Sequence, residues 1–215
     1  MLEFWLKAAF VAVFAYLCGC FNGAVIVSKY ILRNDVRNHG SGNAGLTNFY
    51  RVFGGGLTFV VIACDVLKAI VAVLVGVAVA NAWAPAFWQG DLTVYARYFA
   101  GLFCLLGHAY PCMFQFRGGK GILSGGTIAI MVDWRVALVV WGGFLVLFLL
   151  TRYVSLGSVF TGFAFPVMAW VVFRDWIILT MAIIMGGLIV WKHRSNIKRL
   201  LAGNENKFSF HKKKA

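Results

Sequence analysis

Long apolar runs alternate with short polar joints along the chain, and this alternation predicts its architecture. A helix needs about 20 apolar residues to cross a hydrocarbon core about 30 Å thick. Seven runs approach that length, at approximately residues 4–30, 54–82, 93–109, 120–133, 135–151, 154–173 and 175–192. The fourth run is short and rich in glycine, so we expect it to span incompletely or to start inside a cavity. The pattern predicts an all-α integral membrane protein with about seven transmembrane helices, although five or six spans also fit.

The basic residues between the runs predict how the protein is oriented. With the N-terminus outside, 15 of the 20 lysines and arginines fall at the inner face, as the positive-inside rule requires. We therefore expect the C-terminus to be cytoplasmic, and tryptophans 83, 88, 134 and 176 to lie in interfacial belts. The first run continues too far for a removable signal peptide, so we interpret it as a retained span. Residues 1–215 are expected to form a single multi-pass domain with a basic tail from about 204 to 215.

Composition narrows the classes of function. With 61% hydrophobic and only 13% charged residues, the chain lacks the polar surface of a soluble enzyme. The excess of 20 Lys and Arg over 7 Asp and Glu favours anionic lipid headgroups or phosphorylated substrates. Nucleic acid is not expected as a partner, because the basic residues are divided among joints between apolar runs. Four of the five cysteines lie within apolar runs and predict neither a disulfide framework nor a metal site.

The first inner loop, residues 35–51, combines glycines with hydrogen-bond donors. Gly40, Gly42 and Gly45 permit tight turns in which successive backbone N–H groups point into one concavity that can hold an anion. The side-chain donors beside these glycines include those of Ser41, Asn43, Thr47, Asn48 and Arg51. The arginine can form paired hydrogen bonds with a phosphate. The same composition is also typical of an ordinary turn-rich loop.

The second inner loop, residues 108–121, places cations beside a helix start. Arg117 and Lys120 flank Gly118 and Gly119 immediately before a predicted helix. Backbone donors, the positive end of a helix and two cations thus converge, as phosphate sites require. The spacing is not that of a Walker A motif. The alternative is a simple positive-inside anchor after a helix broken by Pro111.

The remaining inner joints carry weaker signals. Ser155 lies in the third joint, where a serine in a membrane helix more often bonds its own backbone or a neighbouring helix. In the last inner segment, His193, Asn196 and Ile197 recur at helical spacing and predict a short interfacial helix. The alternative is a basic tail on anionic lipid, which we prefer for the lysines at 212–214.

Two charged residues occur inside the second run. Asp65 and Lys68 are three residues apart and therefore face one way on a helix. Intramembrane charges indicate a function by default, but a structural ion pair fits equally well. Asp35 and His39 have the spacing of a helical pair, but the glycines that follow make a helix there doubtful.

Taken in order, four segments resemble the motifs of the bacterial acyl-phosphate:glycerol-3-phosphate acyltransferases, the PlsY family. The first matching segment is residues 40–48 together with Arg51, and the second is His108, Pro111 and residues 116–121. The third is residues 153–156, and the fourth is residues 193–205. The chain departs from the family pattern at Cys20, where serine is common, and at Leu46, Ala69 and residues 122–124. Because Leu123 can narrow the mouth of the second loop, we expect this departure to affect the preference for acyl chain or donor before it affects activity.

The resemblance implies transfer of a fatty acyl group from acyl phosphate to the sn-1 hydroxyl of glycerol 3-phosphate. The products are lysophosphatidate and phosphate, in the first acylation step of phospholipid synthesis at the cytoplasmic side of a bacterial inner membrane. The resemblance implies no cofactor. The expected partners of the protein are the two substrates and membrane lipids, and we expect a monomer. On this basis our hypothesis assigns catalysis to Ser41, Arg51, Lys120, His193 and Asn196. The same hypothesis assigns substrate binding to Asn43, Gly45, Thr47, Asn48, His108, Arg117, Gly118, Gly119 and Ser155.

Two other classes remain open from the sequence. A transporter of phosphate or of a phosphorylated small molecule could also use glycine loops, short helices and an intramembrane ion pair. The chain shows no internal repeat, and its recognisable polar loops face one side, which argues against a transporter. A non-catalytic membrane scaffold would leave the four motifs unexplained.

Overall fold

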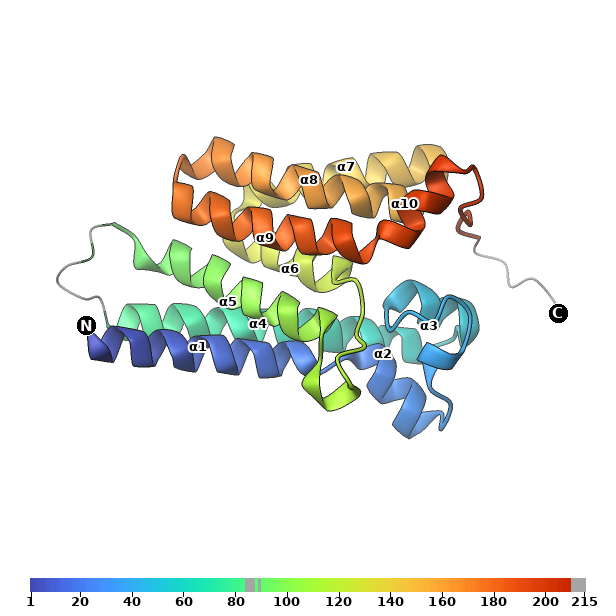
Figure 1. Cartoon of the computed structure of the whole chain (residues 1–215), viewed down its shortest axis with the longest axis horizontal. Helices are drawn as coiled ribbons and strands as arrows, with labels where there is room; N and C mark the ends of the chain where they lie inside the picture. The colour runs from blue at the N-terminus through green and yellow to red at the C-terminus, as the bar shows by residue number, and fades with distance from the viewer. Residues whose placement is uncertain (84–87, 89, 210–215) are drawn as a thin grey trace. The chain divides into compact units, whose positions relative to one another are not determined.

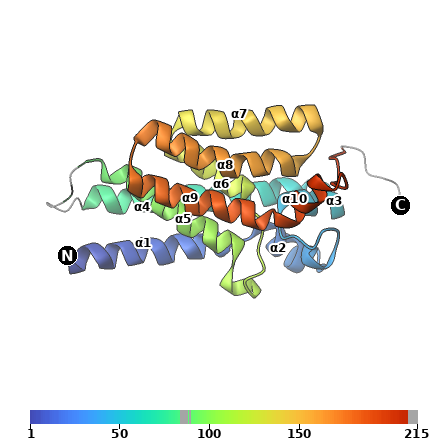
Figure 2. The same cartoon turned by 45° about the horizontal axis from the view of Figure 1, so that its top comes forward.

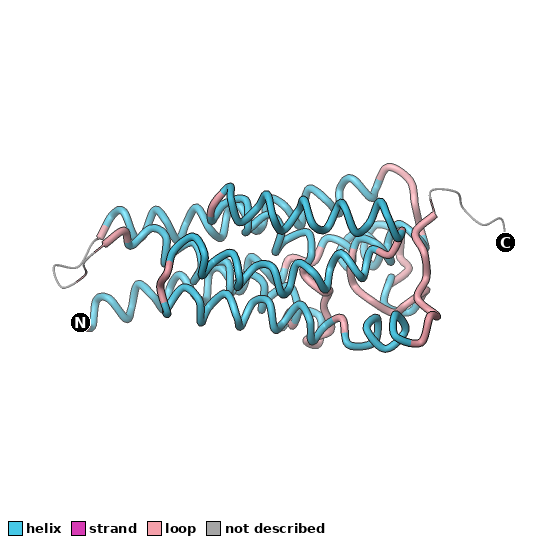
Figure 3. The backbone as a smooth tube through the Cα atoms, turned by 90° about the horizontal axis from the view of Figure 1, so that it is seen from above, coloured by secondary structure: helices cyan, strands magenta, loops and turns pink. Residues whose placement is uncertain are grey.

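The computed structural model describes residues 1–83, 88 and 90–209. Every regular element within these residues is a helix, as the tube in Figure 3 shows, so the all-α prediction is confirmed there. The chain divides into two compact units, Met1–Val132 and Asp133–Ala215. The predicted lipid-binding lysines at 212–214 lie outside the described residues.

Four longer helices form the body of the first unit. These are α1 (Leu2–Cys20), α4 (Leu57–Ala82), α5 (Leu92–Ala109) and α6 (Ile122–Val132). Helices α1, α4 and α5 pack against one another, and α6 packs on α4 and α5 (Figure 1). Helices α1 and α5 approach closely at Gly19 and Gly107, where an added Cβ on either would overlap the backbone of the other helix. Small residues at such crossings are typical of helix packing in membranes.

One end of the first unit consists of short helices. In order they are α2 (Gly23–Ile26), the π-helix η1 (Val27–Ile31), the 3₁₀ helix η2 (Val36–Asn38), α3 (Leu46–Val52) and the 3₁₀ helix η3 (Cys112–Phe114). The prediction of one continuous span over residues 4–30 is therefore wrong in its extent. Helix α1 ends at Cys20, and the Asn22 side chain accepts a hydrogen bond from the Val25 N–H at 3.0 Å to start α2. This N-cap replaces the backbone bonds that a continuous helix would make.

The second unit contains α7 (Trp134–Thr151), α8 (Val154–Phe173), α9 (Trp176–Lys192) and α10 (Arg194–Leu201). Helix α8 packs against both α7 and α9, which Figure 2 shows beside it. The chain bends by 58° between α9 and α10. Helix α10 confirms the short helix predicted from the spacing of His193, Asn196 and Ile197.

Aspartates start three of the longer helices. The carboxylates of Asp91, Asp133 and Asp175 accept hydrogen bonds from backbone N–H groups in the first turns of α5, α7 and α9, at 2.8 to 2.9 Å. Such N-caps satisfy donors that the helix itself leaves unpaired, and their negative charge suits the positive helix end. Three of the seven acidic residues thus define helix boundaries.

By length and composition, four of the described helices can cross a membrane, namely α1, α4, α7 and α8. The bent pair of α9 and α10 makes five if it is counted as one broken span. Helix α6 is apolar but has only 11 residues, in line with the short fourth run.

Candidate functional site

The first inner loop is folded around the side chain of Asn48. This residue lies in α3 and is 3% exposed. Its amide donates to the backbone oxygens of Val36, His39 and Asn43 at 3.2, 3.0 and 3.0 Å, and its Oδ1 accepts from the Ser41 N–H at 2.9 Å. Since these contacts use the Asn48 amide, this side chain shapes the loop.

Two glycines allow the chain to curl around that amide. Gly40 and Gly42 have φ values of +59° and +69°, in the left-handed region that favours glycine. A Cβ added at Gly40 would also overlap Asn48 Oδ1. Of the three glycines predicted to form tight turns, Gly40 and Gly42 do so, whereas Gly45 is extended, with φ −133°, at the N-cap of α3.

The loop leaves polar groups at the surface. Ser41 and Arg51 are exposed, whereas Asn43, Gly45 and Thr47 are half-buried. Within the described part of the chain, no hydrogen bond or ion pair engages the Ser41 hydroxyl or the Arg51 guanidinium. A hydroxyl and a guanidinium in such positions remain available for an anionic ligand.

An ion pair joins the first loop to the second. Arg37 holds Asp35 through hydrogen bonds of 2.7 to 3.1 Å and donates from Nη1 to the Phe114 carbonyl at 2.9 Å. The Arg37 side chain thereby keeps the pKa of Asp35 below its usual range. Asp35 and His39, which have the spacing of a helical pair in the sequence, do not pair in the structure. The His39 ring instead contacts Asn34 Oδ1 at 2.6 Å.

The glycines of the second loop allow close packing. Gly119 donates its N–H to the His108 carbonyl at 3.1 Å. A Cβ at Gly119 would overlap the His108 ring and would lie 2.7 Å from the Ala44 carbonyl oxygen in the first loop. A Cβ at Gly118 would overlap the His108 carbonyl oxygen. The two predicted inner loops thus meet, and only glycine fits at their junction.

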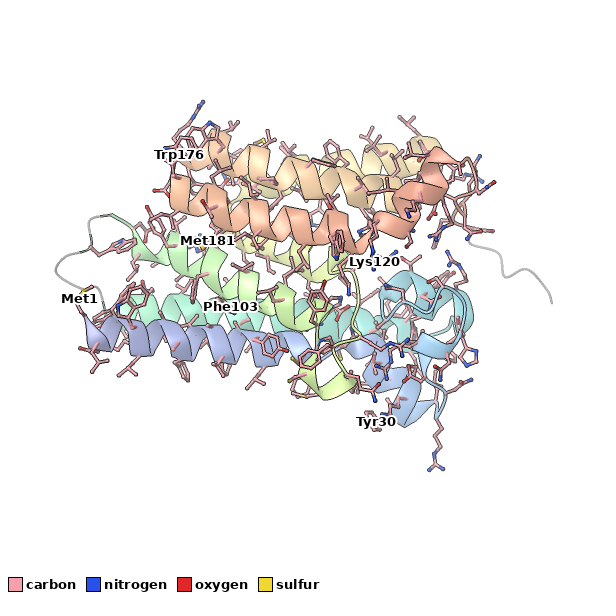
Figure 4. The ribbon with its side chains drawn as sticks, viewed as in Figure 1. Met1, Tyr30, Phe103, Lys120, Trp176 and Met181 are labelled. Atoms are coloured by element: carbon pink, nitrogen blue, oxygen red, sulfur yellow. The ribbon has the colours of Figure 1, made fainter. Side chains whose placement is uncertain are left out.

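Two cations flank this glycine pair. Arg117 is exposed, and Lys120 is half-buried in the loop that joins η3 to α6, where Figure 4 labels it. The first unit therefore carries Ser41, Arg51, Arg117 and Lys120 on two loops that contact each other through Ala44 and Gly119.

A buried ion cluster lies next to the second loop. Lys68 Nζ is 2.6 Å from Asp65 Oδ1 and 2.7 Å from His108 Nδ1. The three residues are 6%, 2% and 2% exposed, respectively. The predicted pairing of Asp65 with Lys68 is confirmed. The participation of His108 was missed, because it depends on the packing of α4 against α5.

The second unit gathers polar side chains around one carboxylate. Glu205 Oε1 accepts from the Ser155 hydroxyl at 2.9 Å and the Asn196 amide at 2.7 Å, and Oε2 accepts from Arg199 Nε at 2.7 Å. Partial burial raises the pKa of Glu205, but these three hydrogen bonds outweigh it and hold the pKa below its usual range. Sequence reasoning did not select Glu205, although it is the only acidic residue after Asp175.

His193 lies at the bend between α9 and α10 and is 3% exposed. Its Nδ1 is 2.8 Å from the Ile189 carbonyl oxygen. A carbonyl can only accept, so Nδ1 carries the hydrogen, and in a neutral ring Nε2 is then an acceptor. This tautomer suits a group that receives or orients a proton. In the described residues, no group of three or more His, Cys, Asp or Glu side chains is arranged to hold a metal ion.

Comparisons with known proteins agree on one family. The family model described as glycerol-3-phosphate acyltransferase matches residues 9–203. A glycerol-3-phosphate acyltransferase of Thermoanaerobacter pseudethanolicus is 38% identical over 200 residues, covering 93% of this chain and 95% of that protein. The enzyme of that name from Aquifex aeolicus is 37% identical over 206 residues, covering 94% and 100%.

Solved structures give the same result. The crystal structure of PlsY, an integral membrane glycerol 3-phosphate acyltransferase, in its glycerol 3-phosphate form is 34% identical, with a TM-score of 0.81 over 94% of this chain and 96% of that one. Its lysophosphatidic acid form has a TM-score of 0.78 at 33% identity, over 94% and 95%.

Proposed function

This chain belongs to the glycerol-3-phosphate acyltransferase family, and we propose that it transfers a fatty acyl group from acyl phosphate to the sn-1 hydroxyl of glycerol 3-phosphate. The products are lysophosphatidate and phosphate. The observation that carries the proposal is the meeting of two glycine loops, which bear Ser41, Arg51 and Lys120 at the end of an apolar helix bundle. Both substrates have a phosphate for the loops, and the acyl chain requires apolar surroundings.

The proposed reaction requires the protein mainly to orient the substrates and to stabilise charge. The sn-1 oxygen attacks the acyl carbon, the bond from that carbon to the phosphate oxygen breaks, and phosphate leaves. Acyl phosphate is a mixed anhydride with a good leaving group, so positioning and electrostatic stabilisation can supply the catalysis without a covalent enzyme intermediate. No cofactor is needed for this reaction.

In the first unit, Ser41, Arg51 and Lys120 bind phosphate oxygens in this proposal. The residues that shape the binding site around them are Asn43, Gly45, Thr47, Asn48, His108, Arg117, Gly118 and Gly119. The Asn48 hydrogen bonds and the tight packing of Gly119 support this division, because they hold the loops while leaving Ser41 and Arg51 exposed.

In the second unit, His193 and Asn196 position glycerol 3-phosphate, and Ser155 lines the site. The hydrogen on His193 Nδ1 makes Nε2 the ring atom that can accept the hydroxyl proton. A substrate phosphate oxygen is the other candidate acceptor. Glu205 adds a support that holds Asn196 and Ser155 together.

We further propose seven membrane segments in one domain, acting as a monomer, with the N-terminus outside and the C-terminus and active site on the cytoplasmic side of a bacterial inner membrane. The bias of basic residues toward one set of joints supports this orientation. The short α6 then acts as an incomplete span. Cysteine labelling from each side of sealed vesicles, at single cysteines placed in the 90–91 and 152–153 joints of a cysteine-free protein, tests the orientation.

The function itself is tested with purified protein and labelled glycerol 3-phosphate, with acyl phosphate and acyl-coenzyme A offered separately. We expect lysophosphatidate only with acyl phosphate. Product only with the thioester would retain the reaction and reassign the donor. If neither donor gives product, and sealed vesicles containing the protein take up glycerol 3-phosphate without a donor, the protein is a carrier and the proposal is wrong.

A further inference from the structure

A chain of buried polar contacts runs from membrane helix α4 to the second glycine loop. It begins with the pair of Asp65 and Lys68 at 2.6 Å and continues from Lys68 to His108 Nδ1 at 2.7 Å. Ionisable residues are costly within a membrane and are retained where they have a task. None of the substrate-binding roles described above uses Asp65 or Lys68.

The geometry at Lys68 fixes how His108 is protonated. The three hydrogens of the ammonium have three acceptors, namely Asp65 Oδ1, the Phe21 carbonyl at 3.0 Å and His108 Nδ1. An ammonium can only donate, so Nδ1 accepts, and a neutral ring carries its hydrogen on Nε2. One edge of the ring is therefore held by the ion pair.

The opposite edge of the same ring supports the loop. A Cβ at Gly119 would overlap His108 Nε2, and a Cβ at Gly121 would lie 3.7 Å from His108 Cδ2. The Gly119 N–H also donates to the His108 carbonyl at 3.1 Å. The residue before Lys120 thus packs directly on the imidazole, whereas Gly121, after it, packs first on the Leu105 side chain and next to the ring.

We propose that His108 is a positioning residue whose ring, anchored by Lys68 and Asp65, sets the place of the backbone that carries Lys120. This inference rests on the proposed function, in which Lys120 binds a substrate phosphate. His108 acts through the loop and does not touch the reacting atoms. A displacement of about 1 Å at a reacting centre can cost about 10²-fold in rate, so activity depends on the anchor that fixes this loop.

Two substitutions of His108 test the contributions of the two ring edges separately. His108→Asn keeps a polar acceptor close to the place of Nδ1 and removes the edge under Gly119. His108→Gln reaches toward the place of Nε2 and removes the acceptor for Lys68. We expect the asparagine variant to melt near the wild-type temperature, to exchange the backbone amides of residues 117–121 faster, and to show a KM for a phosphate substrate raised about tenfold or more. The glutamine variant should chiefly lose thermal stability, since it leaves a buried donor unpaired.

Controls keep the test decisive. Glu3→Gln removes the other lysine pair of this unit, an exposed one with the same 2.6 Å separation, and should leave exchange and KM unchanged. If His108→Asn does not fold, the double variant Asp65→Asn with Lys68→Met removes both buried charges and also releases Nδ1, so the same faster exchange and raised KM are expected. Wild-type exchange and KM in the variant that folds would overturn the positioning role. Faster exchange in a protein that forms no lysophosphatidate even as wild type would instead overturn the proposed function.

A second observation concerns two cysteines. Cys20 Sγ and Cys112 Sγ lie 3.8 Å apart although the residues are 92 positions apart in the chain. Cys20 is the buried last residue of α1, and Cys112 is exposed at the start of η3. Nearby, the Tyr16 hydroxyl donates to the Tyr110 carbonyl at 2.8 Å. The start of the second loop is therefore held against α1 with two thiols within reach of each other.

We infer that Cys20 and Cys112 form a peroxide-sensitive disulfide site. The exposed Cys112 thiolate attacks hydrogen peroxide, the O–O bond breaks, and one water is released as a sulfenic acid forms. Cys20 then attacks that sulfur and displaces a second water, so the two thiols lose two electrons and two protons to the peroxide. An S–S bond of about 2.05 Å draws Cys112 toward α1, and it moves the loop that leads to Gly118 and Gly119.

Intact-mass analysis after peroxide treatment tests this site. We expect the monomer to lose two hydrogen atoms and a disulfide-linked peptide pair to contain Cys20 and Cys112. Activity should fall about two- to fivefold in parallel, as a small displacement near a binding site predicts, and dithiothreitol should restore it. Cys112→Ser should remove both effects, and Cys18→Ser, on the same helix, should retain them. Oxygen addition at Cys112 without the linked peptide would overturn the disulfide site, and linkage without a change in activity would overturn its effect on the second loop.

Discussion

The protein has two polar regions, and a different kind of chemical group organises each of them. The first-unit loops are organised mainly by neutral groups, namely the Asn48 amide and the backbone around Gly119. The ion pairs beside them, Arg37 with Asp35 and Lys68 with Asp65, use neither Ser41 nor Arg51. The second-unit cluster is organised by an anion, Glu205, which uses the Asn196 amide and the Arg199 guanidinium as its own donors. A frame of neutral groups leaves exposed cations and hydroxyls to a ligand, whereas a carboxylate neutralises the cation it binds. The first region is therefore the better place to bind a phosphate.

The largest effect is expected at Asn48. In Asn48→Asp a carboxylate replaces the amide that donates to three backbone carbonyls. Each unsatisfied buried carbonyl costs about 1–3 kcal/mol, and the carboxylate adds repulsion. We expect loss of nearly all activity and a clearly lower melting temperature in detergent. Asn34→Asp, at an exposed asparagine of the same segment, is the control; wild-type activity in Asn48→Asp would contradict a frame built on this amide.

A smaller effect is expected from Gly119→Ala. The added methyl group would overlap the His108 ring and approach the Ala44 carbonyl, so the second loop must move away from the first. We expect kcat/KM to fall at least about tenfold, measured by lysophosphatidate formation. Gly142→Ala, where an added Cβ meets nothing within 4 Å, should behave as wild type. Equal activity of both variants would show that the junction between the loops does not matter.

The smallest effect is expected at Glu205, and it should depend on pH. Because its pKa is lower in the folded protein than the ordinary value of about 4.3, the carboxylate stabilises the fold above that value and loses this contribution as pH falls through the lowered pKa. Glu205→Gln should therefore melt below wild type at neutral pH. The gap should close in acid, and thermal unfolding along a pH series checks this. A gap that is constant with pH would mean that the charge of Glu205 contributes nothing.

The sequence predicted those features that depend on local composition. Gly40 and Gly42 specify the turns of the first loop, the spacing of His193 and Asn196 specifies α10, and the three-residue spacing of Asp65 and Lys68 specifies their pairing. Each of these follows from dihedral preference or helical periodicity alone.

The features that were missed depend on contacts between distant segments. The break after Cys20 is stabilised by Asn22, whose amide donates to the Ala44 carbonyl at 3.0 Å. The binding of Glu205 to Ser155 requires the chain after α10 to return to the start of α8. His108 joins the ion pair only because α4 and α5 pack together. Local patterns carry no information on such pairings.

The central claim is that the first-unit loops bind substrate phosphate, and the kinetic constants of Arg51→Ala and Lys120→Ala test it most directly. The control is Arg135→Ala, which removes an exposed arginine paired with Asp133 at a helix start. We expect both loop variants to lose at least about 10²-fold in kcat/KM, as loss of a charged hydrogen-bonding partner predicts, and the control to retain wild-type turnover. Near-normal turnover of Arg51→Ala and Lys120→Ala at low concentrations of both substrates would contradict the account.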